Sequence, residues 1–368
     1  MAANLLTTQQ IWVDKSNLSK TKVVEQEINL DALGDGEVLL KVDSFGFSAN
    51  NITYALLGDK MGYWGFFQAQ NGWGIVPVWG FATVLKSNVA SIASGERVFG
   101  YLPMASHWVI CADKVSPTGF FDKHSMRKSI SPVYDNYLRC DQDPGYNASK
   151  EAVQMNIRPL FMTSFVLDDF VAEHIDTNVQ SIVLTSASSK TAYGSAHLLL
   201  KHRAERDLTY SVIGLTSPAN KSFTEQLGCY DQVLCYDELQ QLDVKQGAWI
   251  LDFAGNKNVL LKLQLAYAHN LQRMIFIGAT DVQAQANKAE GQLVGEVFFA
   301  PAQVKSRIQQ WGQQKFAEQY AQAWQSFLQL VESNVDVAEY CGVNAMQTVY
   351  QHALAGELSN QNINVIKF

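Results

Sequence analysis

The stretch SIVLTSASSKTAYGSAHLL (residues 181–199) decides the fold class of this chain. It starts with an apolar run, passes through a turn of small polar residues, and ends in a segment with helical spacing. Further apolar runs lie at 210–216, 231–237, 248–255, 273–280 and 295–300, and helical stretches occur at 192–205 and 258–270. Apolar runs that alternate with helices are typical of βαβ units. The pattern therefore predicts an α/β domain with a doubly wound parallel sheet of six strands.

The first third of the chain has a different pattern. Short apolar runs lie at 37–42, 80–87, 96–102 and 107–112, separated by turns that contain Gly and Ser. They predict a small β-rich, barrel-like domain. The polar segment 113–150, which contains three prolines, is interpreted as a long excursion or lid.

The C-terminal part is predicted to be helical and then to end in a strand. Residues 304–332 place aromatic side chains at helical spacing, which favours packing in a core. The run INVIKF (363–368) is predicted to form the final strand.

Length and composition limit the classes of function. A chain of 368 residues with 47% hydrophobic and 17% charged residues predicts a folded protein of about two domains. The net charge of −7 argues against nucleic-acid binding or a polybasic membrane patch as the main role. The N-terminal residues predict no signal peptide, and no apolar stretch reaches the roughly 18 residues that a membrane helix needs. The five cysteines form no CxxC pair, which favours free thiols and a cytoplasmic location.

Three parts of the sequence carry a resemblance to a known superfamily. They are GEVLLKVDSFGFSANNITYALLGD (36–59), VPVWGFATVLKSNVASIASGERVFG (76–100), and residues 181–199 together with 210–237 and 273–280. In this order they resemble the medium-chain dehydrogenase/reductase superfamily, particularly its zinc-free, quinone-reductase-like branch. The resemblance covers nearly the whole chain except 113–150, and it indicates a divergent subfamily.

The resemblance implies two domains. A GroES-like catalytic domain is expected over residues 1–160, completed by 341–368. A Rossmann-like dinucleotide-binding domain is expected over 161–340.

The sequence departs from the zinc-dependent members of the superfamily. Those members carry a Cys in the first loop and a Gly-His-Glu after the next strand. Here the loop from Ser48 to Tyr54 has no Cys, and the second position reads PVWGF (77–81). No set of His and Cys suits a three-ligand catalytic zinc, so we expect no metal site and hydride transfer without a Lewis acid.

The glycine-rich turn of the superfamily aligns with SASSKTA (186–192), which contains no glycine. Ser can replace Gly where φ is negative, and hydroxyl groups, an ammonium group and a helix N-terminus are all suited to an anion. The residues predicted here to bind the cofactor are Ser186, Ser188, Ser189, Lys190, Thr191 and Ala192. We favour dinucleotide binding by this altered loop. Loss of cofactor binding, with these residues as ordinary cap and surface residues, is the main alternative, and a P-loop without its glycines is a third.

The end of the second predicted strand favours NADPH over NADH. NAD-dependent enzymes place an acidic residue there for the ribose hydroxyls, whereas this chain reads GLTS (214–217). Thr216 and Lys221 would suit a 2′-phosphate, and a plain surface turn is the alternative. NADPH is predicted to bind between the domains. Thr163, which the resemblance places near the nicotinamide, and Gly278, at the carboxyl end of a strand, are further predicted contacts.

Tyr54 is the predicted catalytic residue. The resemblance places it in a loop near the nicotinamide, where a phenol can donate a proton to the reduced acceptor. A tyrosine that packs in the core is an equally good interpretation. Seven aromatic residues between Met61 and Phe81 fit a cleft for a quinone or an enone, the protein core, or the face of a homodimer.

Together these features predict a zinc-independent, NADPH-dependent oxidoreductase. It would transfer a hydride to a quinone or an α,β-unsaturated carbonyl, and the substrate would be an apolar or aromatic small molecule. The alternative is a catalytically silent member that acts as a binding or scaffold protein, and the missing glycines are its best support. The sequence leaves the oligomeric state open, a homodimer included.

Overall fold

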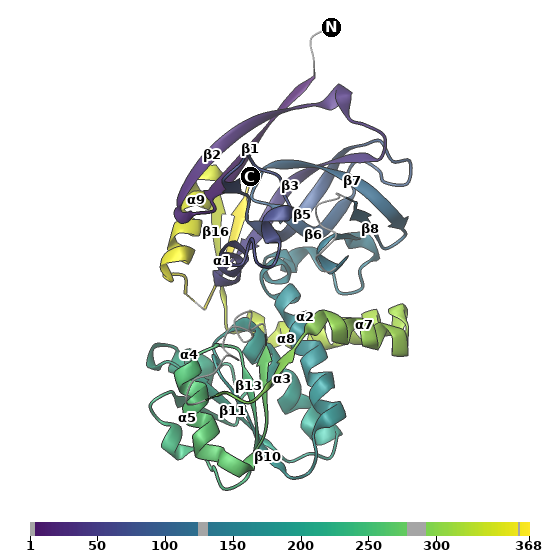
Figure 1. Cartoon of the computed structure of the whole chain (residues 1–368). Helices are drawn as coiled ribbons and strands as arrows, with labels where there is room; N and C mark the ends of the chain where they lie inside the picture. Colours follow the sequence, from purple (N-terminus) through teal and green to yellow (C-terminus); the bar gives the residue numbers. More distant parts are fainter. Residues whose placement is uncertain (1–3, 124–131, 278–291, 360) are drawn as a thin grey trace. The chain divides into compact units, whose positions relative to one another are not determined.

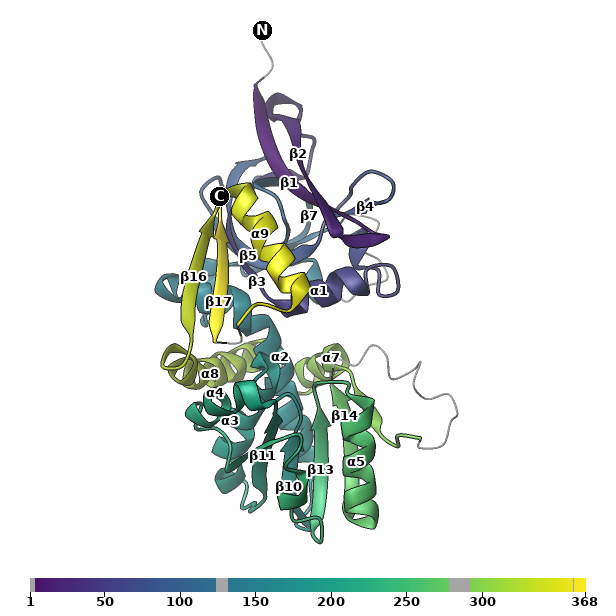
Figure 2. The same cartoon turned by 90° about the vertical axis from the view of Figure 1, so that its left-hand side faces the viewer.

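The computed structural model describes residues 4–123, 132–277, 292–359 and 361–368. The chain divides into two compact units (Figures 1 and 2). Unit 1 contains residues 1–156 and 335–368, and unit 2 contains residues 157–334. No helix in these described stretches is long and apolar enough to span a membrane.

Unit 1 is built on a closed β-barrel, which confirms the predicted β-rich domain. Its strands, in order around the barrel, are β3 (Glu37–Phe47), β5 (Pro77–Ser87), β6 (Arg97–Pro103), β9 (Asn136–Arg139), β8 (Gly119–Asp122) and β7 (His107–Ser116). The barrel closes because β3 pairs with β7 as well as with β5. Strands β8 and β9 come from the segment interpreted as an excursion or lid. That interpretation is wrong for them, because both belong to the barrel wall.

A long hairpin at the N-terminus was not predicted. Strands β1 (Leu5–Asp14) and β2 (Asn17–Asn29) form it, and β4 (Trp73–Gly74) adds to β1. Helix α9 (Gly342–Ala355), also not predicted, lies along this hairpin in both views (Figures 1 and 2). The hydroxyl of Tyr350 donates to the carbonyl of Leu18 at 2.8 Å, so the two ends of the chain are held together.

The last strands extend the barrel sheet beyond β3. The predicted final strand is β17 (Asn362–Lys367), which pairs antiparallel with β3 and parallel with β16 (Asp336–Cys341). Strand β16 was not predicted. Its residues are exposed or only partly buried, so its sequence carries only a weak apolar pattern.

Unit 2 has the predicted parallel sheet. Its strand order is β12 (Gln232–Cys235), β11 (Ser211–Thr216), β10 (Val179–Leu184), β13 (Gly247–Asp252), β14 (Leu271–Ile277) and β15 (Glu296–Phe298). All neighbouring pairs run parallel, as the prediction requires. The order of connection reverses between β10 and β13, and ligands of open α/β sheets bind at the carboxyl ends of the strands beside such a switch point.

The helices of unit 2 flank this sheet or pack beside it. They are α2 (Glu151–His174), of which the first six residues belong to unit 1, α3 (Lys190–Glu205), α4 (Lys221–Gln226), α5 (Lys257–Tyr267), α7 (Ala300–Trp311) and α8 (Gln313–Glu332). Residues 304–332, predicted to be helical, lie in two helices, which are separated at Gly312, whose φ of +83° favours glycine. The predicted core packing is confirmed for α8, where Phe327 stacks on Phe161 with ring centroids 4.6 Å apart and Trp324 is fully buried.

Candidate functional site

The turn between β10 and α3 lies at the carboxyl edge of the sheet, next to the switch point. Ser186 has a φ of +49°, in the left-handed region. The expectation that Ser replaces Gly here because φ is negative is therefore wrong for Ser186. Its backbone N–H donates to the hydroxyl of Tyr236 at 2.9 Å, which holds the residue in this conformation.

Ala187 is fixed by three contacts from neighbouring strands. Its N–H donates to the carbonyl of Leu215, and its own carbonyl accepts from the hydroxyl of Tyr230 at 2.8 Å. The Cβ of Ala187 packs against Gly214. Any side chain at position 214 would collide with it, because a Cβ added to Gly214 would lie 2.8 Å from the Cβ of Ala187. The turn is thus held by strands β11 and β12 and their flanks. No pattern in the sequence predicts the roles of Tyr230 and Tyr236.

The free energy of unfolding of a Ser186→Gly variant is expected to equal or exceed that of the wild type. A left-handed conformation costs a residue with a side chain about 1 kcal/mol, which glycine avoids. Ser188→Gly is the matched control, because Ser188 is buried and has no positive φ, and it is expected to be destabilising by about 0.5–1 kcal/mol or more. Urea unfolding of both variants measures the difference. Equal destabilisation would contradict the assigned conformation.

A buried aspartate links the two strands at the switch point. Asp252, at the end of β13, is 1% exposed and accepts a hydrogen bond from the hydroxyl of Thr185 at 2.6 Å. It also accepts from the N–H groups of Ala254 and Gly255 at 3.1 and 3.0 Å. This carboxylate ties the ends of β10 and β13 together. The sequence signal for this role is an acidic residue at the end of an apolar run, and it was not among the predicted site residues.

The first turn of α3 presents polar groups without partners. The Oγ of Ser189, at the N-cap, is buried and makes no hydrogen bond in the part of the chain that the structure describes. The ammonium of Lys190 forms no ion pair or hydrogen bond with any described residue, and burial lowers its pKa to about 8. The first backbone N–H groups of a helix also lack partners within the helix. A phosphate group would satisfy all three kinds of donor.

The other residues predicted in this turn pack more tightly. Ala192 is fully buried, which fits its predicted packing role. The carbonyl of Thr191 accepts from the hydroxyls of Ser164 and Ser195 at 2.8 and 2.9 Å. Because Thr163 precedes Ser164 on α2, the structure brings it close to the first turn of α3.

The residues predicted for a 2′-phosphate are less available. Thr216 ends β11 beside the turn, but it is only 1% exposed. The ammonium of Lys221 donates to the carboxylate of Glu238 at 2.7 Å, so an anion would compete with that acid. Gly278 lies outside the described residues.

Tyr54 lies in unit 1, on the short helix α1 (Ala49–Leu56). The amide Nδ2 of Asn50, one turn earlier, donates to its hydroxyl oxygen at 2.7 Å. The side chain is 7% exposed, and burial raises the pKa of Tyr54 to about 12. The phenol is therefore protonated at neutral pH. Its oxygen accepts from Asn50, so its own O–H is left to donate elsewhere.

The aromatic run after α1 is mostly core. Tyr63, Trp64, Phe66, Phe67 and Phe81 are buried and pack in the core, and Phe66 also lines a pocket. Trp73 and Trp79 are only partly buried.

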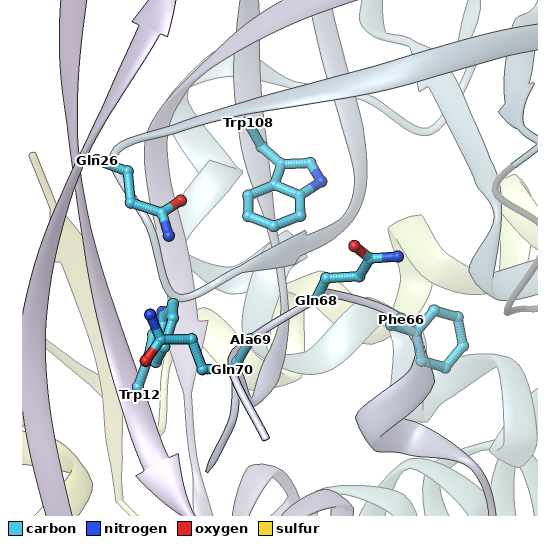
Figure 3. Close-up of a pocket in the computed structure, with 7 residues that line it drawn as sticks. All are labelled: Trp12, Gln26, Phe66, Gln68, Ala69, Gln70 and Trp108. Carbon is cyan, nitrogen blue, oxygen red and sulfur yellow. The ribbon is translucent and has the colours of Figure 1, made fainter. Parts of the chain in front are cut away.

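A pocket in unit 1 opens beside this run. It has a volume of about 360 Å³ and is lined by Trp12, Gln26, Phe66, Gln68, Ala69, Gln70 and Trp108 (Figure 3). The lining combines aromatic faces with neutral carboxamides and contains no charged side chain. Phe66 connects the pocket to the surroundings of Tyr54, because its ring also contacts Tyr63 and Tyr101, which flank Tyr54. Among the described residues, no three His, Cys, Asp or Glu side chains cluster as metal ligands would.

Solved structures with a similar fold include enoyl reductases. The chain is similar to CurA from Vibrio vulnificus, solved in complex with NADPH, with a TM-score of 0.61, 12% identity and 98% of both chains covered. It is similar to a mutant form of enoyl thioester reductase from Candida tropicalis, with a TM-score of 0.59, 12% identity and 99% and 100% of the two chains covered. A mutant of Etr1p in complex with NADP and crotonyl-CoA gives a TM-score of 0.60 at 12% identity, with the same coverage.

These likenesses define the class of fold: a GroES-like domain joined to a Rossmann domain, as in the medium-chain dehydrogenase/reductase superfamily. The predicted fold class is confirmed. Within that class, the chain belongs to the family described as "Protein of unknown function (DUF2855)", whose family model matches residues 45–359. No significantly similar sequence was found among curated proteins.

Proposed function

We propose that the chain is an NADPH-dependent reductase that works without zinc and transfers a hydride to an α,β-unsaturated carbonyl or a quinone. One observation carries the proposal. At the carboxyl edge of the sheet, beside the switch point, the start of α3 holds the Lys190 ammonium and the Ser189 hydroxyl, neither of which has a partner among the described residues. The neighbours in complex with NADP or NADPH support the choice of cofactor.

The residues of the turn fit the pyrophosphate of a dinucleotide. Lys190 supplies a charge that no described acid neutralises, and Ser189 supplies a buried hydroxyl. The buried methyl of Ala192 keeps the helix close to the sheet, which is what the third glycine of the usual fingerprint does. Ser188, Thr191 and Thr163 remain predicted contacts around this turn. Ser186 acts through the backbone conformation that it gives the turn.

The proposed preference for NADPH rests on the end of β11 and the turn that follows it. No acid ends β11, and Lys221 lies at the next turn, where it is paired with Glu238. We propose that a 2′-phosphate displaces Glu238 from Lys221. Thr216 would contribute through its backbone, because its side chain is buried.

Tyr54 is the proposed proton donor. When bound, NADPH supplies the hydride, and the reduced acceptor then needs one proton. The O–H bond of Tyr54 breaks as the proton passes to the acceptor, and the electron pair stays on the phenol oxygen. The amide of Asn50 donates to that oxygen and stabilises its negative charge.

The pocket of Figure 3 is the proposed site for the part of the substrate that does not react. Two indole rings and three carboxamides line it without any charge. Such a lining suits a neutral group with an apolar face and some hydrogen-bonding atoms. A cytoplasmic location and a homodimer remain predictions.

Oxidation of NADPH in the presence of a panel of enones, enoyl thioesters and quinones tests the proposal. We expect consumption of NADPH with at least one class of acceptor, and slower consumption of NADH. If neither NADPH nor NADH is consumed with any acceptor, the result favours the second candidate, a binding or scaffold protein. The turn without glycine is the observation that favours that candidate.

A further inference from the structure

Tyr54 belongs to a cluster of four phenols in unit 1. Its members come from different parts of the chain: Tyr54 from α1, Tyr63 from the 3-10 turn Tyr63–Gly65, Tyr101 from β6 and Tyr134 from the 3-10 turn Pro132–Tyr134. The ring centroid of Tyr54 is 4.7 Å from that of Tyr63 and 5.6 Å from that of Tyr101. The rings of Tyr101 and Tyr134 are 5.0 Å apart.

The hydroxyl of Tyr101 is the unusual member of this cluster. Tyr101 is 0% exposed, and its Oη makes no hydrogen bond in the described part of the chain. An unpaired buried hydroxyl is unfavourable, whereas phenylalanine would fill the same space without this cost. Packing therefore gives no reason for the hydroxyl of Tyr101.

The surroundings hold Tyr101 firmly in place. The hydroxyl of Tyr137, on β9, donates to the carbonyl of Tyr101 at 2.9 Å. The ring of Tyr137 also lies against Gly100, where an added Cβ would come within 2.6 Å of the ring. Strand β9 comes from the segment 113–150, which also supplies Tyr134. This segment thus builds one side of the phenol cluster.

The hydroxyls of Tyr101 and Tyr54 lie close enough for each to affect the pKa of the other. Burial raises the pKa of Tyr101 well above its usual range, and the neighbouring hydroxyl of Tyr54 raises it further. For Tyr54, burial and the nearby Tyr63 raise the pKa, whereas polar hydrogens of Trp79, Asn50 and Tyr101 act in the opposite direction. No charged side chain is among these influences on Tyr54. Tyr101 thus favours the phenolate form of Tyr54.

We propose that Tyr101 is a positioning residue for the proton donor, and that its hydroxyl donates a hydrogen bond to the oxygen of Tyr54 as Tyr54 gives up its proton. This inference rests on the proposed function of Tyr54. In this step Tyr101 keeps its own proton, and only the O–H bond of Tyr54 breaks. Hydrogen bonds to charged oxygens are stronger than those to neutral oxygens. The contact therefore strengthens in the transition state, which is the condition for raising the rate. Catalytic hydrogen bonds are often long or poorly aligned before the substrate binds.

Titration of the phenols in the cofactor-free protein is the decisive test. The protein is labelled with 3-fluorotyrosine, whose phenol is more acidic, and the ¹⁹F signal of Tyr54 is identified by its loss in a Tyr54→Phe variant. In a Tyr101→Phe variant, the ionisation of Tyr54 is expected to become at least about tenfold less favourable. In the NADPH-oxidation assay, turnover is expected to fall about tenfold to hundredfold, with unchanged affinity for NADPH.

Tyr350→Phe is the matched control. Tyr350 is also fully buried in unit 1, but its hydroxyl donates to Leu18. This variant should lose stability and leave both the ionisation of Tyr54 and the turnover unchanged, whereas Tyr101→Phe should lose no stability. An unchanged titration of Tyr54 in Tyr101→Phe overturns the inference, whether or not the protein reduces any acceptor. A changed titration in a protein that reduces no acceptor supports the contact between the two hydroxyls and overturns the proposed function.

Discussion

A Lys190→Met variant is expected to bind NADPH about tenfold to hundredfold more weakly than the wild type, and yet to be more stable. The loss of affinity follows because a hydrogen bond to a charged group contributes about 1.5–3 kcal/mol, and 1.4 kcal/mol changes Kd tenfold. The gain in stability follows because the ammonium of the wild-type protein is desolvated and pairs with no described residue. Methionine fills a similar volume without a charge. Isothermal titration and urea unfolding measure the two effects.

The gain in stability should depend on pH in a definite direction. The pKa of Lys190 is lowered from 10.5 to about 8 in the folded chain, so the unfolded chain binds more protons between these values. The wild type therefore becomes more stable relative to the variant as the pH rises from about 8 to 10.5. Below pH 8 the free energy of unfolding of the variant should exceed that of the wild type by about 1–2 kcal/mol. This difference is smaller than the full pKa shift would give, because the side chain of Lys190 is partly exposed.

Lys201→Met is the matched control for this experiment. Lys201 lies on the same helix, is exposed, and is far from the first turn. The control removes the same charge from the protein, so any effect of net charge appears in both variants. Equal loss of NADPH affinity in the two variants, or a loss of stability in Lys190→Met, would contradict the assignment of Lys190 as a phosphate-binding residue.

A Tyr54→Phe variant is expected to lower turnover by about a hundredfold or more while the affinity for NADPH stays the same. A positioned general acid contributes about 10²–10⁴ in rate, and phenylalanine has no proton to give. Because burial raises the pKa of Tyr54 to about 12, the phenol keeps its proton at neutral pH and well above it. Ionisation of Tyr54 should therefore cause no loss of turnover below about pH 11. Steady-state rates between pH 6 and 10 measure this.

The control for Tyr54→Phe is again Tyr350→Phe, which removes a buried hydroxyl elsewhere in unit 1. Its turnover should equal that of the wild type under conditions where both are folded. Similar turnover in Tyr54→Phe and the wild type would remove Tyr54 from the mechanism. Near-ultraviolet circular dichroism of each variant verifies that the aromatic core is intact.

The parallel sheet could be predicted because its strands are short apolar runs between turns, a pattern that local sequence carries. The hairpin of β1 and β2 could not, because residues 17–29 are mostly polar and largely exposed. Strands β8 and β9 have four residues each, and only their pairing with β6 and β7 makes them part of the barrel. The break at Gly312 had a signal in the glycine itself, which the helical spacing of the flanking aromatics outweighed.

The candidate site could be predicted in type but not in detail. Hydroxyl groups and a lysine at the start of a helix indicated an anion site, because that chemistry is local. The left-handed conformation of Ser186 could not be predicted, because Tyr236, 50 residues away, holds it. The same holds for Tyr101, whose relation to Tyr54 depends on how β6 and α1 pack. The pairing of Lys221 with Glu238 joins residues 17 apart in the chain, and β12 lies between them.

The central claim is that the turn before α3 binds NADPH, and isothermal titration of the wild-type protein with NADPH and NADH tests it most directly. At pH 8.5, in two buffers with different heats of ionisation, we expect NADPH to bind more tightly than NADH. We also expect a net uptake of protons, because a phosphate beside Lys190 raises a pKa that is about 8 in the free protein. Lys190→Met should show no such uptake. The absence of binding of either dinucleotide at millimolar concentration, about −4 kcal/mol, would contradict the claim.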